Sequence, residues 1–280
     1  MTLSEFSSVP FSRFVTVTRG VSFFLREYDK DYRFQGERHL FWEFVILLSG
    51  RALITAGDRV LHMSAGDAIL HPPGEFHAIS GDGGKSFKFG VFSFHGNATP
   101  PPNRCFHLPE VLTSRFLELL EQSRLIFRFW DDAFFWERLP EKENEAARFT
   151  NHIEHYLACC LDYPAQRHTP PTQSEEHYRR LMDVIREGLT RRMSVPQLAA
   201  AAGMSVSNAK RIFARYAKTG LADYYHRAVA EHARELLANG ATVAETADAL
   251  GFSDVNYFSV FYKRITGEPP RNHKLREEKG

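Results

Sequence analysis

The sequence contains few cysteines, no long apolar run and almost no net charge. Its three cysteines among 280 residues include no pair with CxxC spacing, which excludes a disulfide-stapled miniprotein and indicates reduced thiols. Charged residues interrupt every apolar stretch well before the length that a membrane-spanning helix needs. The first residues lack a basic start followed by an apolar block, so no signal peptide is expected. With 43% hydrophobic and 25% charged residues, the chain is predicted to be cytoplasmic and to bury real cores, in two domains of ordinary size.

The net charge of +1 is the sum of two segments with different compositions. Residues 175–280 carry 17 Lys and Arg against 13 Asp and Glu, whereas the residues before them carry an acidic excess. Twenty of the 24 Phe and all three Trp lie before residue 175. We therefore predict an aromatic N-terminal domain over 1–163, a polar Pro-rich linker over 164–174, and a C-terminal domain over 175–280 that meets an anion.

The N-terminal part is predicted to consist mainly of short strands. Runs rich in Val, Ile and Phe are separated by Gly and Pro at short intervals, which is typical of a sandwich or small barrel. After the Pro run at 100–102 the apolar period becomes helical and predicts two helices, near 110–128 and 141–162, that pack on the barrel. The predicted strands cover 13–18, 21–28, 43–48, 51–55, 67–71 and 87–94.

The C-terminal part contains an internal repeat. When Gly203 is aligned with Gly251, residues 195–213 match residues 243–262. Each copy predicts an Ala-rich helix, a Gly turn with positive φ, and a second helix that begins at a Ser or Asp N-cap. A predicted helix near 222–239 connects the copies, and its ~18 residues span ~27 Å. This connection could place two recognition helices about one DNA turn, ~34 Å, apart.

The second helix of each copy has one apolar face and one polar face. A helix of this width fits the major groove, where Arg, Lys, Asn and Ser bind base edges or phosphates. Any small helical hairpin with solvated basic residues shares this pattern, but two tandem copies favour DNA binding. The predicted DNA contacts are Ser207, Asn208, Lys210, Arg211, Arg215, Val255, Asn256, Ser259, Val260, Lys263 and Arg264.

The second copy also carries a specific set of spaced residues. These residues are Ala247, Leu250-Gly251-Phe252, Asp254, Tyr257-Phe258, Tyr262-Lys263-Arg264, Gly267 and Pro269-Pro270. Through them the segment at about 185–275 resembles the DNA-binding domain of the AraC/XylS family of bacterial transcription regulators. The resemblance implies operator DNA, a second copy of the chain and RNA polymerase as partners. The chain departs from the family pattern at Ala209, where Leu is frequent, and at Lys218, where Gly is frequent.

Two spaced motifs in the N-terminal part resemble the cupin fold, a small double-stranded β-barrel. In the first, His39 precedes Glu43 by four residues and Gly50 follows; the second reads GDAILHPPGEFH and ends at His77. The resemblance places His39, Glu43 and His77 at positions that bind metal in cupin enzymes, and two imidazoles with one carboxylate suit Fe(II), Mn(II) or Zn(II). Glu37 stands where the metal-binding pattern usually has another His. We therefore expect an effector pocket and no cofactor, and keep these three residues as the candidate ligands of a divalent metal.

A barrel of this size can hold one small ligand. We expect Arg38 to pair with a carboxylate and Trp42 to stack on a sugar or aromatic ring. The alternative is a barrel that is filled by its own side chains and only dimerises. The ligand-binding candidates are Arg38, His39, Trp42, Glu43, His77 and His95. The candidates for the dimer interface are Leu112, Phe116, Leu119, Leu120 and Ile153 on the two predicted helices.

The sequence therefore predicts an α+β multidomain protein, with a cupin-like β-barrel and packed helices followed by an all-α domain with two helix-turn-helix motifs joined by a long helix. We expect a cytoplasmic, homodimeric transcription regulator that lacks enzyme activity and membrane contact. It would bind double-stranded DNA under the control of a small molecule, such as a sugar or organic acid. Two alternatives remain. A cupin-type metal-dependent enzyme fused to a DNA-binding domain would contain stoichiometric metal, and a ligand-independent regulator would show no ligand-induced change in barrel melting.

Overall fold

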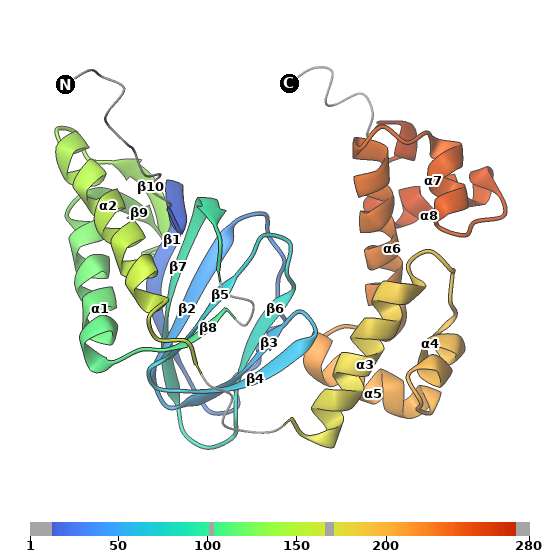
Figure 1. Cartoon of the computed structure of the whole chain (residues 1–280), viewed down its shortest axis with the longest axis horizontal. Coiled ribbons are helices and arrows are strands. Elements are labelled where there is room, and N and C mark those ends of the chain that lie inside the picture. The colour runs from blue at the N-terminus through green and yellow to red at the C-terminus, as the bar shows by residue number, and fades with distance from the viewer. Residues whose placement is uncertain (1–12, 101–103, 166–170, 273–280) are drawn as a thin grey trace, which may run out of the picture. The chain divides into compact units, whose positions relative to one another are not determined.

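A computed structural model describes residues 13–100, 104–165 and 171–272, and these form two compact units (Figure 1). The first unit, drawn mainly from the residues before 166, is rich in strands, and the second, drawn mainly from residue 171 on, is helical. The predicted α+β class, with a β-rich domain before a helical domain, is confirmed. None of the helices in the described part of the chain combines the length and hydropathy that crossing a membrane requires.

The strands of the first unit form two sheets. They are β1 (Val15–Tyr28), β2 (Trp42–Ser49), β3 (Arg51–Ala56), β4 (Arg59–Ser64), β5 (Asp67–His71), β6 (His77–Gly81), β7 (Phe87–Ala98), β8 (Cys105–His107), β9 (Phe127–Trp130) and β10 (Phe134–Arg138). The larger sheet has the order β8-β5-β2-β7-β1-β10-β9, and the smaller has the order β4-β3-β6. β1 continues through Gly20 with bulges, so the two strands predicted at 13–18 and 21–28 are one.

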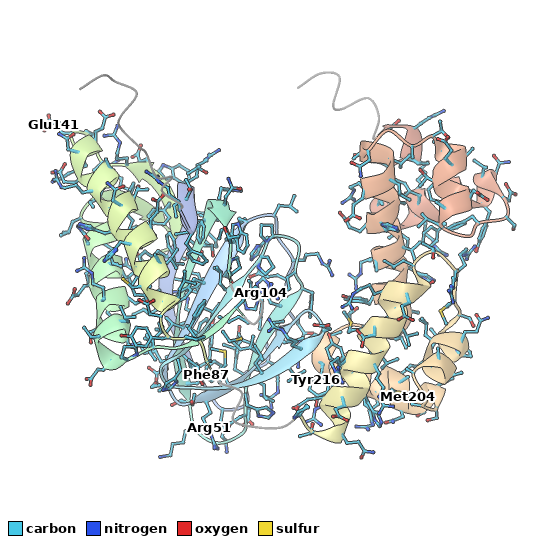
Figure 2. The ribbon with its side chains drawn as sticks, in the orientation of Figure 1. Arg51, Phe87, Arg104, Glu141, Met204 and Tyr216 are labelled. Carbon is cyan, nitrogen blue, oxygen red and sulfur yellow. The ribbon has the colours of Figure 1, made fainter. Side chains whose placement is uncertain are left out.

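The central strands of the larger sheet, β2 and β7, are mainly apolar, and most of their residues are buried on both faces of the sheet. Alternate residues of a strand point to opposite faces. Val45 of β2 packs between the two sheets against Ile54 of β3, while Ile46 belongs to the core on the other face. Phe87 of β7, labelled in Figure 2, is fully buried between the sheets. A continuous apolar run is the usual sequence pattern of a strand buried on both sides.

Two helices, α1 (Glu110–Arg124) and α2 (Glu143–Cys160), cover the outer face of the larger sheet (Figure 1). Their apolar stripes pack against this sheet within the same chain, where Phe116 contacts Phe23 at a ring-centroid distance of 5.1 Å. Phe116, Leu119, Leu120 and Ile153 are all buried there, and Leu112 is half-buried against the same core. The prediction that these residues form a dimer interface is therefore wrong for the four buried ones, because a single chain already covers them.

The described part of the second unit contains six α-helices around one core. They are α3 (Gln173–Gly188), α4 (Val195–Ala201), α5 (Val206–Ala217), α6 (Leu221–Ala238), α7 (Val243–Ala249) and α8 (Val255–Thr266), followed by the short 3-10 helix η2 (Pro270–Asn272). Leu198, Phe213 and Phe258 belong to this single core although they come from α4, α5 and α8. α3 begins at Gln173, inside the segment predicted as a linker, and Thr172 caps it. Residues 166–170 of that segment lie outside the described residues.

Candidate functional sites: two helix-turn-helix motifs and a polar cluster in the β-rich unit

The first helix-turn-helix motif consists of α4 and α5. Gly203 lies in the turn between them with φ at 72°, a backbone conformation that favours glycine. Ser205 caps α5 by accepting a hydrogen bond from the backbone N–H of Asn208 at 3.3 Å. Ile212 and Phe213 on the inner face of α5 are buried. The turn, the cap and the buried face together fix the direction in which α5 presents its outer face.

The second motif, α7 and α8, repeats this construction. Gly251 in its turn has φ at 70°, and a Cβ at this position would lie 2.9 Å from the carbonyl oxygen of Thr190. Asp254 caps α8 by accepting a hydrogen bond from the backbone N–H of Asn256 at 2.7 Å. Phe258 and Tyr262 are buried on the inner face of α8. The equivalent glycines, caps and buried faces match the sequence alignment of the two copies.

Nine of the eleven residues predicted to contact DNA are exposed, and Asn208 and Ser259 are half-buried. Val260 is 66% exposed although it is apolar. An exposed Val on the outer face of a recognition helix has the chemistry to contact a thymine methyl group. The side chain of Arg211 donates a hydrogen bond to Asn208 Oδ1 at 2.8 Å, which orients two of the candidate residues before any ligand binds. That these residues contact DNA remains a prediction.

Sequence reasoning missed a cationic group beside α8. Arg192 lies between α3 and α4, and its guanidinium lies 4.3 Å from the ring centroid of Phe252 and 4.8 Å from that of Tyr257. Arg192 also donates a hydrogen bond to the Tyr257 hydroxyl at 3.4 Å, and this contact lowers the pKa of Tyr257. Arg192 lies outside both repeat copies, so the repeat alignment carried no signal for it.

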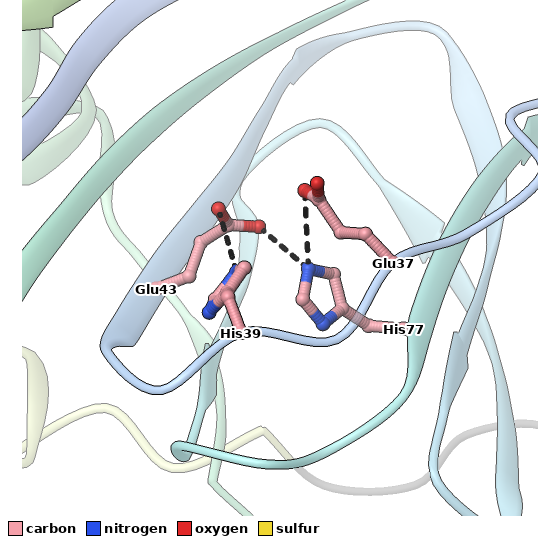
Figure 3. A group of neighbouring side chains, drawn as sticks. All are labelled: Glu37, His39, Glu43 and His77. Atoms are coloured by element: carbon pink, nitrogen blue, oxygen red, sulfur yellow. Dashed lines mark ion pairs between the residues drawn. The ribbon is translucent and has the colours of Figure 1, made fainter. Parts of the chain in front are cut away.

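A polar cluster of Glu37, His39, Glu43 and His77 lies in the β-rich unit (Figure 3). Glu43 is on β2 and His77 begins β6, whereas Glu37 and His39 lie in the segment that precedes β2. An antiparallel bridge joins Glu37 to His77, with reciprocal backbone hydrogen bonds of 2.9 and 3.1 Å. This bridge brings the segment before β2 onto β6 and completes the cluster.

The carboxylate of Glu43 lies at the centre of this cluster. His77 Nε2 lies 3.1 Å from Glu43 Oε1 and 3.6 Å from Glu37 Oε1, and His39 Nε2 lies 3.5 Å from Glu43 Oε2. Burial opposes ionisation of Glu43, but the two neighbouring histidines outweigh it and hold the pKa of Glu43 well below its usual range. Burial likewise opposes protonation of His77, but Glu37 and Glu43 outweigh it and raise the pKa of His77 to about 10.

Glu43 belongs to a row of buried polar residues that crosses four strands of the larger sheet. In strand register it pairs with His71 of β5 on one side and with Ser93 of β7 on the other, and Ser93 pairs with Ser22 of β1. Ser93 donates a hydrogen bond to Glu43 Oε2 at 3.0 Å, and Ser22 donates one to Ser93 at 2.9 Å. The ring of His71 stacks on that of His77 with centroids 4.5 Å apart. This row places polar groups inside an otherwise apolar sheet.

A cavity of about 190 Å³ opens beside the cluster. One part of its lining is polar, with Glu37, Glu43, His71 and His77. The rest of the lining is mainly aromatic and aliphatic, and Arg26 contributes a guanidinium group to it. The aromatic lining residues are Phe24, Tyr28, Tyr32, Phe34, Phe89 and Phe134. The arrangement fits a small molecule with an apolar body and a polar end.

The structure separates the six predicted ligand-binding residues. Glu43 and His77 line the cavity, and His39 contacts Glu43 from outside this lining. Arg38 and His95 are exposed, and Trp42 packs against the core beneath α1 and α2. These last three residues are absent from the cavity lining, and that they bind a ligand stays a prediction. Trp42 precedes Glu43 on β2, so the two side chains must point to opposite faces of the sheet.

Comparisons with known proteins agree with these two units. A helix-turn-helix domain model matches residues 198–276, and an AraC-like ligand binding domain model matches residues 19–123. The chain is 32% identical over 130 residues to the uncharacterized HTH-type transcriptional regulator YidL of Escherichia coli, covering 46% of this chain and 42% of that protein. It is 24% identical over 270 residues to the MmsAB operon regulatory protein of Pseudomonas aeruginosa, covering 90% of this chain and 80% of that protein.

Among solved structures, the chain is similar to a transcriptional regulator with an AraC-type DNA-binding domain from Chromobacterium violaceum. The sequence identity is 22%, the match covers 38% of this chain and 96% of that chain, and the TM-score is 0.34.

Proposed function

The chain belongs to the AraC family of transcription regulators, and from this premise we propose that it binds operator DNA through α5 and α8 under the control of a small molecule in the N-terminal cavity. The observation that carries the DNA-binding part is the matched pair of capped helices with buried inner faces and exposed outer faces. Such helices enter successive major grooves when one rigid unit holds them.

The predicted contacts divide into two chemical groups. The cations suit phosphates or guanine edges: Lys210, Arg211, Arg215, Lys263 and Arg264 are exposed, and the half-buried Arg192 adds a sixth beside α8. Phosphate contacts release counterions, so affinity should fall steeply as the salt concentration rises. Exposed Asn256 and Val260 suit base edges, through an amide and a methyl group.

The test is a fluorescence anisotropy titration of the full chain with its own upstream DNA. The double variant Arg211→Ala with Asn256→Ala removes one candidate contact from each recognition helix. We expect it to lose ~2–6 kcal/mol of specific binding, since each good contact contributes ~1–3 kcal/mol of discrimination. Arg234→Ala on α6 is the matched control, because it removes a cation outside both recognition helices. Equal affinity of the wild type for operator and random duplex at physiological salt would refute this part of the proposal.

We propose that the cavity binds its ligand without transforming it, and that the ligand has an apolar or aromatic body. The aromatic walls support the apolar body, and the polar residues and Arg26 support a polar or acidic end. A ligand can alter transcription only by binding the DNA-competent and DNA-incompetent states unequally. We further propose that the chain acts as a homodimer in the cytoplasm, where it meets operator DNA and RNA polymerase.

Calorimetric titration with small acids, sugars and aromatic compounds tests the cavity. Ala78 of β6 lines the cavity, so Ala78→Met fills space that the ligand would occupy. Loss of ligand binding in this variant, with unchanged operator affinity in the ligand-free chain, is the expected result. A ligand that binds the filled variant as tightly as the wild type does not occupy this cavity.

A further inference from the structure

The two edges of the larger sheet differ in how the chain covers them. β8 forms one edge, and residues after α2 continue it: an antiparallel bridge joins Phe106 to Pro164, and the backbone N–H of Ala165 donates a hydrogen bond to the carbonyl oxygen of Cys105 at 2.9 Å. β9 forms the other edge, in the hairpin that it makes with β10 (Figure 1). Within the described ranges of the chain, β10 is the only strand that pairs with β9. A sheet edge of this kind presents N–H and C=O groups that can pair with another strand.

β9 lacks the features with which proteins usually protect an exposed edge. Its sequence, FRFW, contains neither Pro nor Lys, and the bulge of the hairpin lies in β10 rather than in β9. Trp130 of β9 is 65% exposed, and Trp136 of β10 is 68% exposed. Large apolar side chains that are clustered and exposed to this extent mark interaction surfaces. The edge therefore has the character of an interface.

The exposed aromatic side chains lie on one face of the hairpin. Phe129 of β9 and Phe135 of β10 pack against the core beneath α1 and α2. Side chains alternate along a strand, so Trp130 and Phe134 point to the opposite face, where their ring centroids lie 6.3 Å apart. Together with Trp136 they expose about 350 Å² per chain, at ~200 Å² for a whole aromatic side chain. This area is close to half of the ~800 Å² that one partner of a stable interface buries, and the backbone and charged groups of the edge can supply the rest.

We propose that β9 pairs antiparallel with β9 of a second copy of the chain, which joins the two larger sheets into one across a two-fold axis. This inference rests on the homodimer of the proposed function and assigns an interface to it. The apolar stripes of α1 and α2 are already covered within one chain, so they are not available for this role. A two-fold interface must be self-complementary, because the same surface patch faces itself. β9 meets this requirement in one register.

Backbone geometry and charge select this register. Residues opposite one another in an antiparallel pair point to the same face, so the two-fold axis must pass by a residue and not between two. An axis at either terminal residue of β9 would leave one pair within the strand, because Leu125 before it is helical and Asp131 after it has φ at 52°. An axis at Arg128 would set two guanidinium groups opposite each other, which is unfavourable. An axis at Phe129 avoids both problems and places Arg128 opposite the partner's Trp130 on each side.

Arg128 is suited to contact an indole ring in this register. Its side chain is exposed and donates a hydrogen bond to Glu137 Oε1 at 2.6 Å. This bond uses the edge of the guanidinium group and leaves its planar face available to stack on an aromatic ring. Glu137 also balances the charge of Arg128, so the two chains do not bring an excess of positive charge together. Two cation–π contacts between Arg128 and the partner's Trp130 therefore flank the axis.

Sedimentation velocity of the full chain without DNA measures the dissociation constant of the dimer. Trp130→Lys places an ammonium group opposite Arg128 of the partner subunit and should raise this constant by more than ~100-fold, because Trp is a typical interface hot spot and the two-fold axis doubles the loss. Trp130→Glu removes the same ring but places a carboxylate opposite Arg128. Its constant should therefore stay at least ~10-fold below that of Trp130→Lys at low salt. Val111→Lys is the matched control, because Val111 is 70% exposed at the end of α1 that is far from β9 in sequence.

Cysteine cross-linking tests the register directly. A chain with Arg128→Cys mixed with a chain with Trp130→Cys should form a mixed disulfide dimer, since opposite residues have Cα atoms ~4.5–5.5 Å apart. Each variant alone should cross-link poorly, because residues offset by two positions on paired strands are ~7–8 Å apart, beyond the reach of a disulfide. The wild type reports the background from the three cysteines of the chain.

The proposal is overturned if the wild type sediments as a monomer at every concentration tested, or if Trp130→Lys leaves its dimer intact. It is also overturned if Trp130→Lys and Trp130→Glu have equal dissociation constants, or if the mixed cysteine pair cross-links no faster than either variant alone. Anisotropy with operator DNA on the same samples separates the two proposals. Operator preference in a chain that does not pair through β9 refutes only this interface, and pairing through β9 without operator preference refutes only the proposed DNA binding.

Discussion

Replacing Gly251 by alanine should destabilise the helical unit more than the same replacement at Gly203, its equivalent in the first motif. Both glycines have positive φ, at 70° and 72°. A Cβ at Gly251 would meet the Thr190 carbonyl oxygen at 2.9 Å, whereas the nearest atom at Gly203 is the end of the Arg180 side chain at 3.9 Å. The pair therefore separates the cost of the backbone conformation from the cost of a steric clash.

The magnitudes follow from these two costs. A left-handed conformation costs alanine ~1–2 kcal/mol, partly offset by ~0.4–1 kcal/mol from a less flexible unfolded chain. We therefore expect Gly203→Ala to reduce the free energy of unfolding by about 1 kcal/mol. Overpacking against a backbone atom adds ~1–3 kcal/mol, which gives about 2–4 kcal/mol for Gly251→Ala.

Urea unfolding measured with two probes provides the assay. All three tryptophans precede residue 175, so their fluorescence reports the first unit, while far-UV circular dichroism is dominated by helix. With a slope of ~2 kcal/mol per molar urea, a 2 kcal/mol difference separates the two midpoints by about 1 M. Coincident circular dichroism midpoints for the two variants, or a shift of the tryptophan transition, would refute the reasoning.

Three further results are expected. Phe116→Ala should lower the stability of the first unit by ~3–5 kcal/mol in tryptophan-monitored unfolding, because it leaves a cavity beneath the larger sheet, while operator affinity is retained. Thr242→Ala breaks the capping box of α7 and should lower the free energy of unfolding of the helical unit by ~1 kcal/mol, as measured by circular dichroism. Thr113→Ala, on α1 and outside any cap, is the control and should leave the unfolding transition of the helical unit unchanged. Lys263→Ala should reduce the slope of log affinity against log salt by ~1 for any duplex sequence, and an unchanged slope would mean that this ammonium meets no phosphate.

The helix-turn-helix motifs were predictable because their signals are local. The Gly turn, the N-cap and the apolar period of each copy lie within about twenty residues of one another, and the structure has them where the sequence predicts them. Arg192 was missed because it reaches α8 from outside the repeat. Strand β6 was missed because its His, Ser and Gly resemble a turn, although tertiary packing buries the whole strand.

The polar cluster was only partly predictable because its register is non-local. The spacing of His39, Glu43 and His77 indicated the region, but only the bridge that pairs Glu37 with His77 brings the fourth residue into place. Trp42 was predicted to share the cavity with Glu43, and strand alternation already argues against that pairing. Side chains alternate between the two faces of a strand, so the sequence of β2 alone already predicts that Trp42 and Glu43 lie on opposite faces.

The single core beneath α5 and α8 has a consequence for the operator. Because Leu198, Phe213 and Phe258 pack into one hydrophobic interior, the two recognition helices are held at a fixed distance and cannot slide relative to one another. The protein then requires a fixed spacing between the two DNA segments that it contacts. One base pair inserted between these segments rotates one segment relative to the other by ~34–36°, because the duplex has ~10–10.5 base pairs per turn. The duplex, rather than the protein, must absorb any mismatch in spacing, and bending it costs ~1–6 kcal/mol. Operator flexibility between the two contacts therefore contributes to recognition even where no side chain touches a base.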